Sequence, residues 1–226
     1  MIQISELQAL RHSYSPKLPK IFKNEIAIKL RTSSLKIQNI EEDIKNILKN
    51  SANLTLLEAS SEIILDVKPL NIGIILSGGQ APGGHNVIAG IFDAAKSLNK
   101  DNKLMGFLGG PLGLLEEDFI EITSELIDKY RNTGGFDIIG SGRTKLESDQ
   151  QFQKSKEILK KHNINSLVII GGDDSNTNAA MLAEYLKEEK SDINIVGCPK
   201  TIDGDLKNEF IETSFGFDTA TKVYSE

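Results

Sequence analysis

The sequence lacks the features of disulfide-bonded, membrane-spanning and exported proteins. It has one cysteine, Cys198, among 226 residues, so no disulfide can form within it, which fits a reducing compartment. No run of about 18 apolar residues occurs, so we expect no transmembrane helix. The first twenty residues lack a basic end followed by an apolar core, and so do not resemble a secretory signal. We therefore expect a cytoplasmic protein.

A basic excess is also missing. The 32 acidic residues outnumber the 26 basic ones, and the net charge is -6. A protein that binds nucleic acid without sequence preference needs a basic face, so we expect no nucleic-acid partner, and we expect no membrane partner either. A locally basic pocket for a small phosphate compound stays possible. With 39% hydrophobic and 26% charged residues, a packed core is possible.

The signatures of several enzyme classes are absent. No serine lies in a G-x-S-x-G elbow, and the three histidines, His12, His85 and His162, show no triad context. No Cys/His cluster has metal-ligand spacing. These absences make acyl transfer less natural than phosphate chemistry.

From about residue 70, continuous apolar runs alternate with amphipathic segments. We expect strands at 71–76, 103–110, 136–142, 166–172 and 193–201. We expect helices at 86–99, 151–163, 177–190 and from 215 onward. Apolar strands separated by helices predict an α/β fold, in which a mostly parallel, Rossmann-like sheet carries helices on both faces.

Residues 1–70 have a different character. We interpret them as a partly helical N-terminal extension that packs on the main domain, with a helix at 38–50 that Asn39 caps and Glu42 supports. Residues 71–226 then form the α/β domain. The chain stops within a predicted helix, so we expect that domain to continue past Glu226 as part of a longer protein.

Three strand-end loops carry unusual residues, and ligands bind at this edge of open α/β sheets. The first, "LSGGQAPGGHN" at 76–86, suggests a phosphate cradle, with Gly79 making the closest backbone approach and the following helix adding its positive end. It matches neither the P-loop nor the dinucleotide fingerprint. The alternative is a tight turn chosen for packing.

The second loop, "GGDDS" at 171–175, places two carboxylates together. A Mg²⁺ ion held by Asp173 and by substrate phosphates would explain the first of them. The alternative is that one aspartate caps a helix that begins near Asn176. Spacing alone favours neither.

The third loop, "PKTIDGDLKN" at 199–208, brings Lys200 near two aspartates. If the backbone is extended, Asp203 and Asp205 lie on one side of it. Phosphoryl transfer to a hydroxyl needs a carboxylate to accept the proton and a cation to offset charge, which Asp203 and Lys200 could supply. Alone, a solvated turn is the better interpretation. Together, the three loops favour phosphoryl transfer.

At this point the sequence resembles the phosphofructokinase family. Five stretches carry the resemblance in the family's order and span about 71–226: "GIILSGGQAPGGHN", "GFLGGPLGLLE", "GSGRTK", "VIIGGDDSNTNA" and "PKTIDGDL". The ATP-using members typically have glycine where this chain has Asp174 and Lys200. Both departures resemble the pyrophosphate-dependent members of the long type.

The resemblance implies transfer of phosphate from pyrophosphate to the 1-hydroxyl of fructose 6-phosphate, reversibly, in a homo-oligomer that we expect to be a dimer. It implies Mg²⁺ at Asp173 and donor choice at Asp174. It implies that Lys200 stabilises the transition state and that Asp203 is the base. The implied pyrophosphate ligands are Gly79, Arg143 and Lys200, and the implied sugar-phosphate ligands are Thr201, Ile202, Asp203 and Asp205.

Alternatives stay open within and beyond this family. One is a non-catalytic regulatory subunit, and another is an ATP-dependent phosphofructokinase. A lipid or NAD kinase shares a similar glycine–aspartate loop, but the stretches at 199–205 and 78–84 speak against it. Further family motifs, including "MGR" and the later sugar-phosphate arginines, would lie beyond Glu226.

Overall fold

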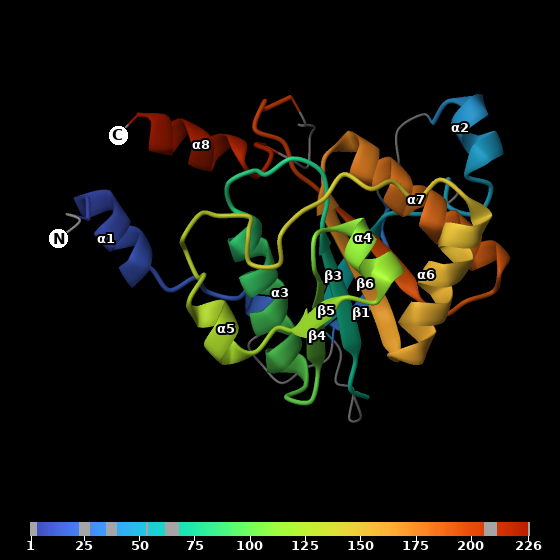
Figure 1. The fold of residues 1–226 in the computed structure, drawn as a ribbon, viewed down its shortest axis with the longest axis horizontal. Coiled ribbons are helices and arrows are strands. Elements are labelled where there is room, and N and C mark those ends of the chain that lie inside the picture. Colours follow the sequence, from blue (N-terminus) through green and yellow to red (C-terminus); the bar gives the residue numbers. More distant parts are fainter. Residues whose placement is uncertain are drawn as a thin grey trace.

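The computed structural model describes residues 4–22, 28–34, 40–52, 54–61, 68–205 and 212–225. Its centre is a five-stranded sheet in the order β5-β4-β3-β6-β7 (Figure 1). The strands are β3 (Asn71–Leu76), β4 (Lys103–Phe107), β5 (Phe119–Glu121), β6 (Ile164–Gly171) and β7 (Asn194–Pro199). Only β5 runs antiparallel to its neighbour, β4, so the predicted mostly parallel sheet is confirmed.

Helices cover both faces of this sheet because the strands alternate apolar side chains between them. Ile74 and Leu76 of β3 point toward α3 and α5, whereas Ile75 points toward α4, α6 and α7. All three side chains are fully buried, and each contributes about 1.5–3 kcal/mol to folding. The helices are α3 (Gly84–Leu98), α4 (Pro111–Glu116), α5 (Ser124–Asp128), α6 (Asp149–Lys161) and α7 (Asp173–Glu188).

The segment expected to be a strand at 136–142 is not one. The N–H of Gly140 donates to the carbonyl of Asp137 at 3.0 Å, and Gly140 has φ +65°, so the chain turns there. Phe136, Ile138 and Ile139 are nevertheless buried. Their apolar run arises from packing against the core rather than from sheet pairing, and periodicity cannot distinguish the two.

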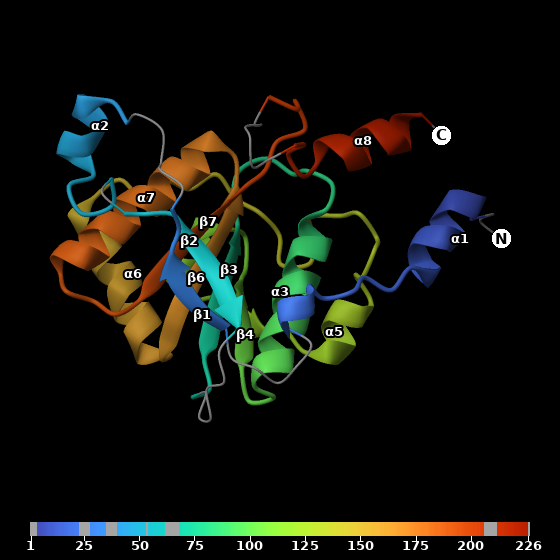
Figure 2. The same cartoon turned by 180° about the vertical axis from the view of Figure 1, so that it is seen from behind.

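The N-terminal region contributes small elements outside the main sheet. These are α1 (Glu6–Ser13), a 3₁₀ turn η1 (Lys20–Phe22), β1 (Ile28–Thr32), α2 (Glu42–Ile47) and β2 (Leu57–Ser61). β1 pairs with β2 in antiparallel fashion, and Figure 2 shows this pair in front of the main sheet. The last helix, α8 (Phe217–Tyr224), confirms the predicted C-terminal helix. A domain boundary at residue 70 stays a prediction.

The helix expected at 38–50 is shorter than predicted, since α2 spans only six residues. Its apolar side is not packed: Ile44 and Ile47 are 44% and 58% exposed. A short helix without such packing gains little stability. The proposed cap, Asn39, lies outside the described residues. Within the described ranges, no helix is both long enough and apolar enough to cross a membrane.

One buried carboxylate joins the N-terminal region to α7. Glu184 accepts hydrogen bonds from the Asn50 backbone and side chain at 2.7 and 2.8 Å and from the Ser51 backbone at 2.9 Å. Burial opposes ionisation of Glu184, but these hydrogen bonds outweigh it, so its pKa is lowered. This contact supports the expectation that the extension packs on the main domain.

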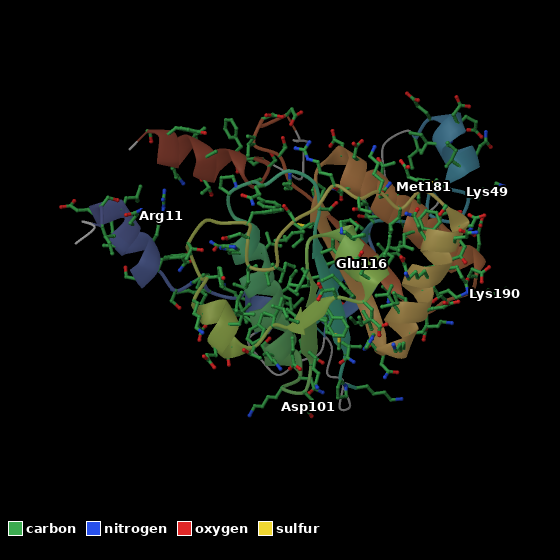
Figure 3. The ribbon with its side chains drawn as sticks, in the orientation of Figure 1. Arg11, Lys49, Asp101, Glu116, Met181 and Lys190 are labelled. Carbon is green, nitrogen blue, oxygen red and sulfur yellow. The ribbon has the colours of Figure 1, made fainter. Side chains whose placement is uncertain are left out.

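The strand ends define where a ligand site would lie. Figure 3 shows Asp101, just before β4, at the end of the sheet opposite the loops that lead to α8. Asp101 therefore marks the amino end of the parallel strands. The glycine-rich loops lie at the other, carboxyl end.

We predict that Glu184→Gln lowers the free energy of unfolding by about 1–3 kcal/mol at neutral pH, because the amide presents N–H groups to donors that need an acceptor. Chemical denaturation followed by circular dichroism measures this, with the exposed Glu188→Gln on the same helix as control. A lowered folded pKa gives stability that is present above the ordinary value of 4.5 and is lost as pH falls through the folded pKa. The difference in the free energy of unfolding between wild type and Glu184→Gln should therefore shrink in acid. Equal stability of the two variants at pH 7 would contradict a stabilising role for the hydrogen bonds of Glu184 to Asn50 and Ser51.

Candidate active site

Two adjoining cavities lie at the carboxyl ends of β3, β6 and β7. Gly172, Asp173 and Lys200 line both of them. The first cavity, of about 420 Å³, is also lined by Ser77, Gly78, Gly79, Arg143, Thr144, Lys145, Asp174, Ser175 and Asn178. The second, of about 350 Å³, is also lined by Gln80, Ala81, Thr201, Ile202, Asp203 and Asp205. Every site residue that the sequence nominated therefore lies on one or both cavities.

A larger cavity, of about 850 Å³, opens between α1 and α8. Of the nominated residues, only Ile202 reaches it. Size alone therefore does not identify the site, because the nominated residues line the two smaller cavities.

The loop after β3 forms one wall of the first cavity. Ser77 donates its N–H to the carbonyl of Ile170, and Gly78 donates to Gly142, both at 2.8 Å. Gly78 has φ +83°, a conformation that favours glycine. A Cβ on Gly79 would lie 3.5 Å from the Arg143 guanidinium, so this backbone and this cation share the wall.

The helix that supplies its N-terminus to the first cavity is α7, not α3 as the sequence suggested. At the start of α3, the N–H groups of Gly83 and His85 donate to the carbonyls of Gly134 and Gly135, each at 3.0 Å. Those donors are occupied by protein. The lining of the first cavity instead includes residues 172–175, the beginning of α7. The positive end of the α7 dipole thus faces the cavity.

The two adjacent aspartates lie in the first turn of α7. The helix begins at Asp173 and its N-cap is Gly172, so the capping alternative is wrong. Negative charge is favourable in a first helical turn. Asp174 is 83% exposed and pairs with Lys145, its Oδ2 lying 3.3 Å from Nζ. Sequence reasoning missed Lys145, although it lies two residues after Arg143 in the quoted "GSGRTK".

Gly171 holds the backbone between the two cavities. Its carbonyl accepts the N–H of Lys200 at 2.9 Å and an amide hydrogen of Asn176 at 2.7 Å. A Cβ on Gly171 would lie 2.8 Å from the Ser77 carbonyl, so no larger residue fits. These contacts bring the carboxyl ends of β3, β6 and β7 together at Gly171.

Lys200 has a largely buried side chain between the cavities. The residue is 8% exposed, and its Nζ lies 5.6 Å from the centre of the Phe136 ring. Burial lowers the pKa of Lys200, the Arg143 charge lowers it further, and Asp203 opposes both. Because a buried ammonium is poorly hydrated, it attracts an anion more strongly than an exposed one does.

The loop after β7 bends, so the extended backbone that would place Asp203 and Asp205 on one side is not present. Thr201 Oγ1 donates to Asp205 at 3.2 Å and accepts the N–H of Asp203 at 3.0 Å. Gly204 has φ +71°, and a Cβ there would press on the Phe217 ring. Both aspartates still line the second cavity.

The carboxylates do not form a metal cage. Across the described ranges, no group of three or more His, Cys, Asp or Glu side chains could hold a metal ion. Mg²⁺ often takes only one or two carboxylates and completes its shell with water and substrate phosphates. Asp173, exposed and on both cavities, fits that second arrangement.

Comparison with known proteins identifies the family of this chain. The sequence pattern described as Phosphofructokinase matches residues 71–226. The chain belongs to the phosphofructokinase family. Its resemblance to this family, and the α/β fold that the resemblance implies, are confirmed.

Relatives of this chain include proteins named pyrophosphate–fructose 6-phosphate 1-phosphotransferase. The one from Porphyromonas gingivalis is 54% identical over 223 residues, covering 98% of this chain and 40% of that protein. The one from Treponema pallidum is 47% identical over 239 residues, covering 100% of this chain and 41% of that protein. The chain therefore spans about two-fifths of the length of these relatives.

A solved structure shares the fold. The pyrophosphate-dependent phosphofructokinase from Nitrosospira multiformis superposes with a TM-score of 0.59 at 25% identity. The match covers 65% of this chain and 37% of that one. The parallel sheet and its covering helices are thus those of a phosphofructokinase.

We predict that the Lys200 amine titrates below the ordinary lysine value of 10.5. Labelling with acetic anhydride across a pH series, read by mass spectrometry, measures its pKa. Arg143→Gln should raise that pKa by removing a like charge, and Asp203→Asn should lower it by removing the opposing one. Shifts in the reverse directions, or a Lys200 pKa at or above 10.5, would contradict the described electrostatics.

Proposed function

We propose that this chain forms part of an enzyme that transfers phosphate from pyrophosphate to the 1-hydroxyl of fructose 6-phosphate. One observation carries the proposal: two cavities meet at Asp173 and Lys200, with cations around the first and carboxylates in the second. A phosphate donor and a hydroxyl acceptor need adjoining sites of that kind. The names of the relatives from P. gingivalis and T. pallidum support the same substrates.

In this proposal the first cavity holds pyrophosphate. Gly79 offers backbone, Arg143 and Lys200 offer positive charge, and the N-terminus of α7 adds its dipole. Lys145 adds a further cation beside Asp174. Asp173 would hold Mg²⁺, which neutralises charge on the phosphate oxygens when it is bound.

The second cavity holds the sugar phosphate. Thr201, Ile202 and Asp205 line it, and Thr201 fixes the Asp205 carboxylate by a hydrogen bond. Asp203 accepts the proton of the 1-hydroxyl as its oxygen attacks the near phosphorus of pyrophosphate. The bond from that phosphorus to the bridging oxygen breaks, and inorganic phosphate leaves. Lys200 offsets the negative charge on the group in transfer.

Donor choice depends on Asp174 in this account. Its carboxylate stands at the mouth of the first cavity, where ATP-using members keep glycine, and would crowd and repel the α-phosphate of a nucleotide. The ion pair with Lys145 holds that carboxylate in place. Exposed pairs of this type add little stability, so its value would be positional.

A regulatory subunit is the second candidate. Such a chain would be expected to lack the base or the metal carboxylate, and this chain keeps Asp203 and Asp173. An ATP-dependent enzyme is disfavoured by Asp174 and Lys200. A dimeric assembly and a cytoplasmic location stay predictions.

Turnover tests the proposal. The protein, expressed from its complete gene, should form fructose 1,6-bisphosphate with pyrophosphate and Mg²⁺ and far more slowly with ATP. Asp203→Asn should lower kcat by about 10²–10⁴-fold, because it removes the base. Asp101→Asn, at the opposite end of the sheet, is the matched control and should be unaffected. Turnover with ATP alone, or full activity of Asp203→Asn, would refute the proposal.

A further inference from the structure

We propose that His85 is a positioning residue that sets the Lys200 ammonium by fixing the Phe136 ring against which it lies. The motif "GGHN" contains His85, and the site described above gives this side chain no role. The inference rests on the proposed role of Lys200 and adds a residue that touches neither cavity. Four observations carry it.

First, the histidine ring is buried, and its Nε2 lies against Asp137 and Ile138. The ring is 1% exposed, and the N–H groups of Asp137 and Ile138 point at Nε2 from 2.9 and 3.1 Å. Two N–H donors directed at one nitrogen favour an Nε2 without a proton, whereas Asp137 Oδ1, which lies 2.9 Å from the same nitrogen, favours a protonated one. Burial lowers the pKa of His85 despite the nearby Asp137 carboxylate, which agrees with a neutral ring.

Second, the other ring nitrogen is the donor. Nδ1 lies 2.7 Å from Thr133 Oγ1, and that hydroxyl donates to the carbonyl of Tyr130 at 2.8 Å. The Thr133 hydrogen is thereby used, so Nδ1 must supply the hydrogen for its own contact. His85 is held as the Nδ1–H form, with both nitrogens occupied by the segment 133–138.

Third, two glycine-rich segments are locked together around this ring. The N–H groups of Gly83 and His85 donate to the carbonyls of Gly134 and Gly135. A Cβ on Gly135 would collide with the His85 ring, and a Cβ on Gly84 would collide with the Phe136 ring. The glycines therefore permit a close contact between protein segments here, rather than room for an anion.

Fourth, the segment 133–138 that His85 holds includes Phe136, whose ring lies against the Lys200 ammonium. Phe136 is 2% exposed, and Lys200 Nζ lies 5.6 Å from the centre of its ring. His85 holds the N–H of Asp137, the residue next in the chain. Loss of the Nε2 acceptor would leave the buried Ile138 donor and the partly buried Asp137 donor unpaired. The segment could then shift, and the ammonium would lose its contact with the Phe136 ring.

Two amide variants separate the acceptor from the bulk of the ring. His85→Gln can place its amide oxygen near the Nε2 position and accept the same donors, whereas His85→Asn is too short and reaches only the Nδ1 position. We expect kcat with pyrophosphate to stay within about threefold for His85→Gln. For His85→Asn we expect kcat to fall by about tenfold or more, because the ammonium that offsets charge on the group in transfer is displaced.

A double-mutant cycle tests whether the effect passes through Lys200. In a Lys200→Met background, His85→Asn should lower kcat no further. Asn102→Leu is the control: its buried side chain bonds Leu70 and Ala95 at the other end of α3, so it should lower the melting temperature without changing kcat. An undiminished loss in the Lys200→Met background would overturn the proposal. So would equal losses in His85→Gln and His85→Asn.

A readout that needs no turnover separates this inference from the proposed reaction. Acetic anhydride labelling of Lys200 should be faster in His85→Asn than in wild type, and should be unchanged in His85→Gln and Asn102→Leu. If wild type shows no pyrophosphate turnover, the proposed function fails, and the labelling still decides the role of His85. Equal Lys200 labelling in wild type and His85→Asn would overturn it.

Discussion

The parallel pairing of β3 with β6 is the constraint on which the rest of the site depends. After a register shift between Asn71 and Ile72, the two strands stay in register to their carboxyl ends, where Leu76 pairs with Ile170. Ser77 continues that pairing by donating to Ile170 and meets the start of α7 through the hydroxyl of Ser175 at 2.8 Å. Because both strands end level, a glycine loop and a carboxylate turn face each other across the first cavity.

The helix α7 joins several parts of the molecule. Its first turn carries Asp173 and Asp174, and Asn178 accepts the N–H of Leu146 at 2.9 Å, which holds the loop that carries Arg143. Further along, Glu184 binds the N-terminal region. A helix that is hydrogen-bonded to other segments along its length fixes the positions of groups whose charges would otherwise repel.

Sequence patterns predicted the sheet and its helices well because strands buried on both faces leave long apolar runs. They failed at 136–142 because a loop buried over the core has the same composition. They misassigned the start of α3 because glycines can serve a protein contact or an anion alike, and only the tertiary structure shows Gly83 and His85 bound to Gly134 and Gly135. The loop residues of the candidate site were found, but Lys145 was not, since its partner Asp174 is distant in sequence.

The central claim is that the first cavity is built for pyrophosphate rather than for a nucleotide, with Asp174 as the discriminating group. Calorimetry of the protein expressed from its complete gene, titrated with Mg²⁺–pyrophosphate and with Mg²⁺–ATP, measures both affinities without turnover. We expect pyrophosphate to bind at least about tenfold more tightly, a difference of about 1.4 kcal/mol, and Asp174→Gly to narrow that ratio. Tighter binding of ATP by the wild type, or a ratio that Asp174→Gly leaves unchanged, would contradict this account.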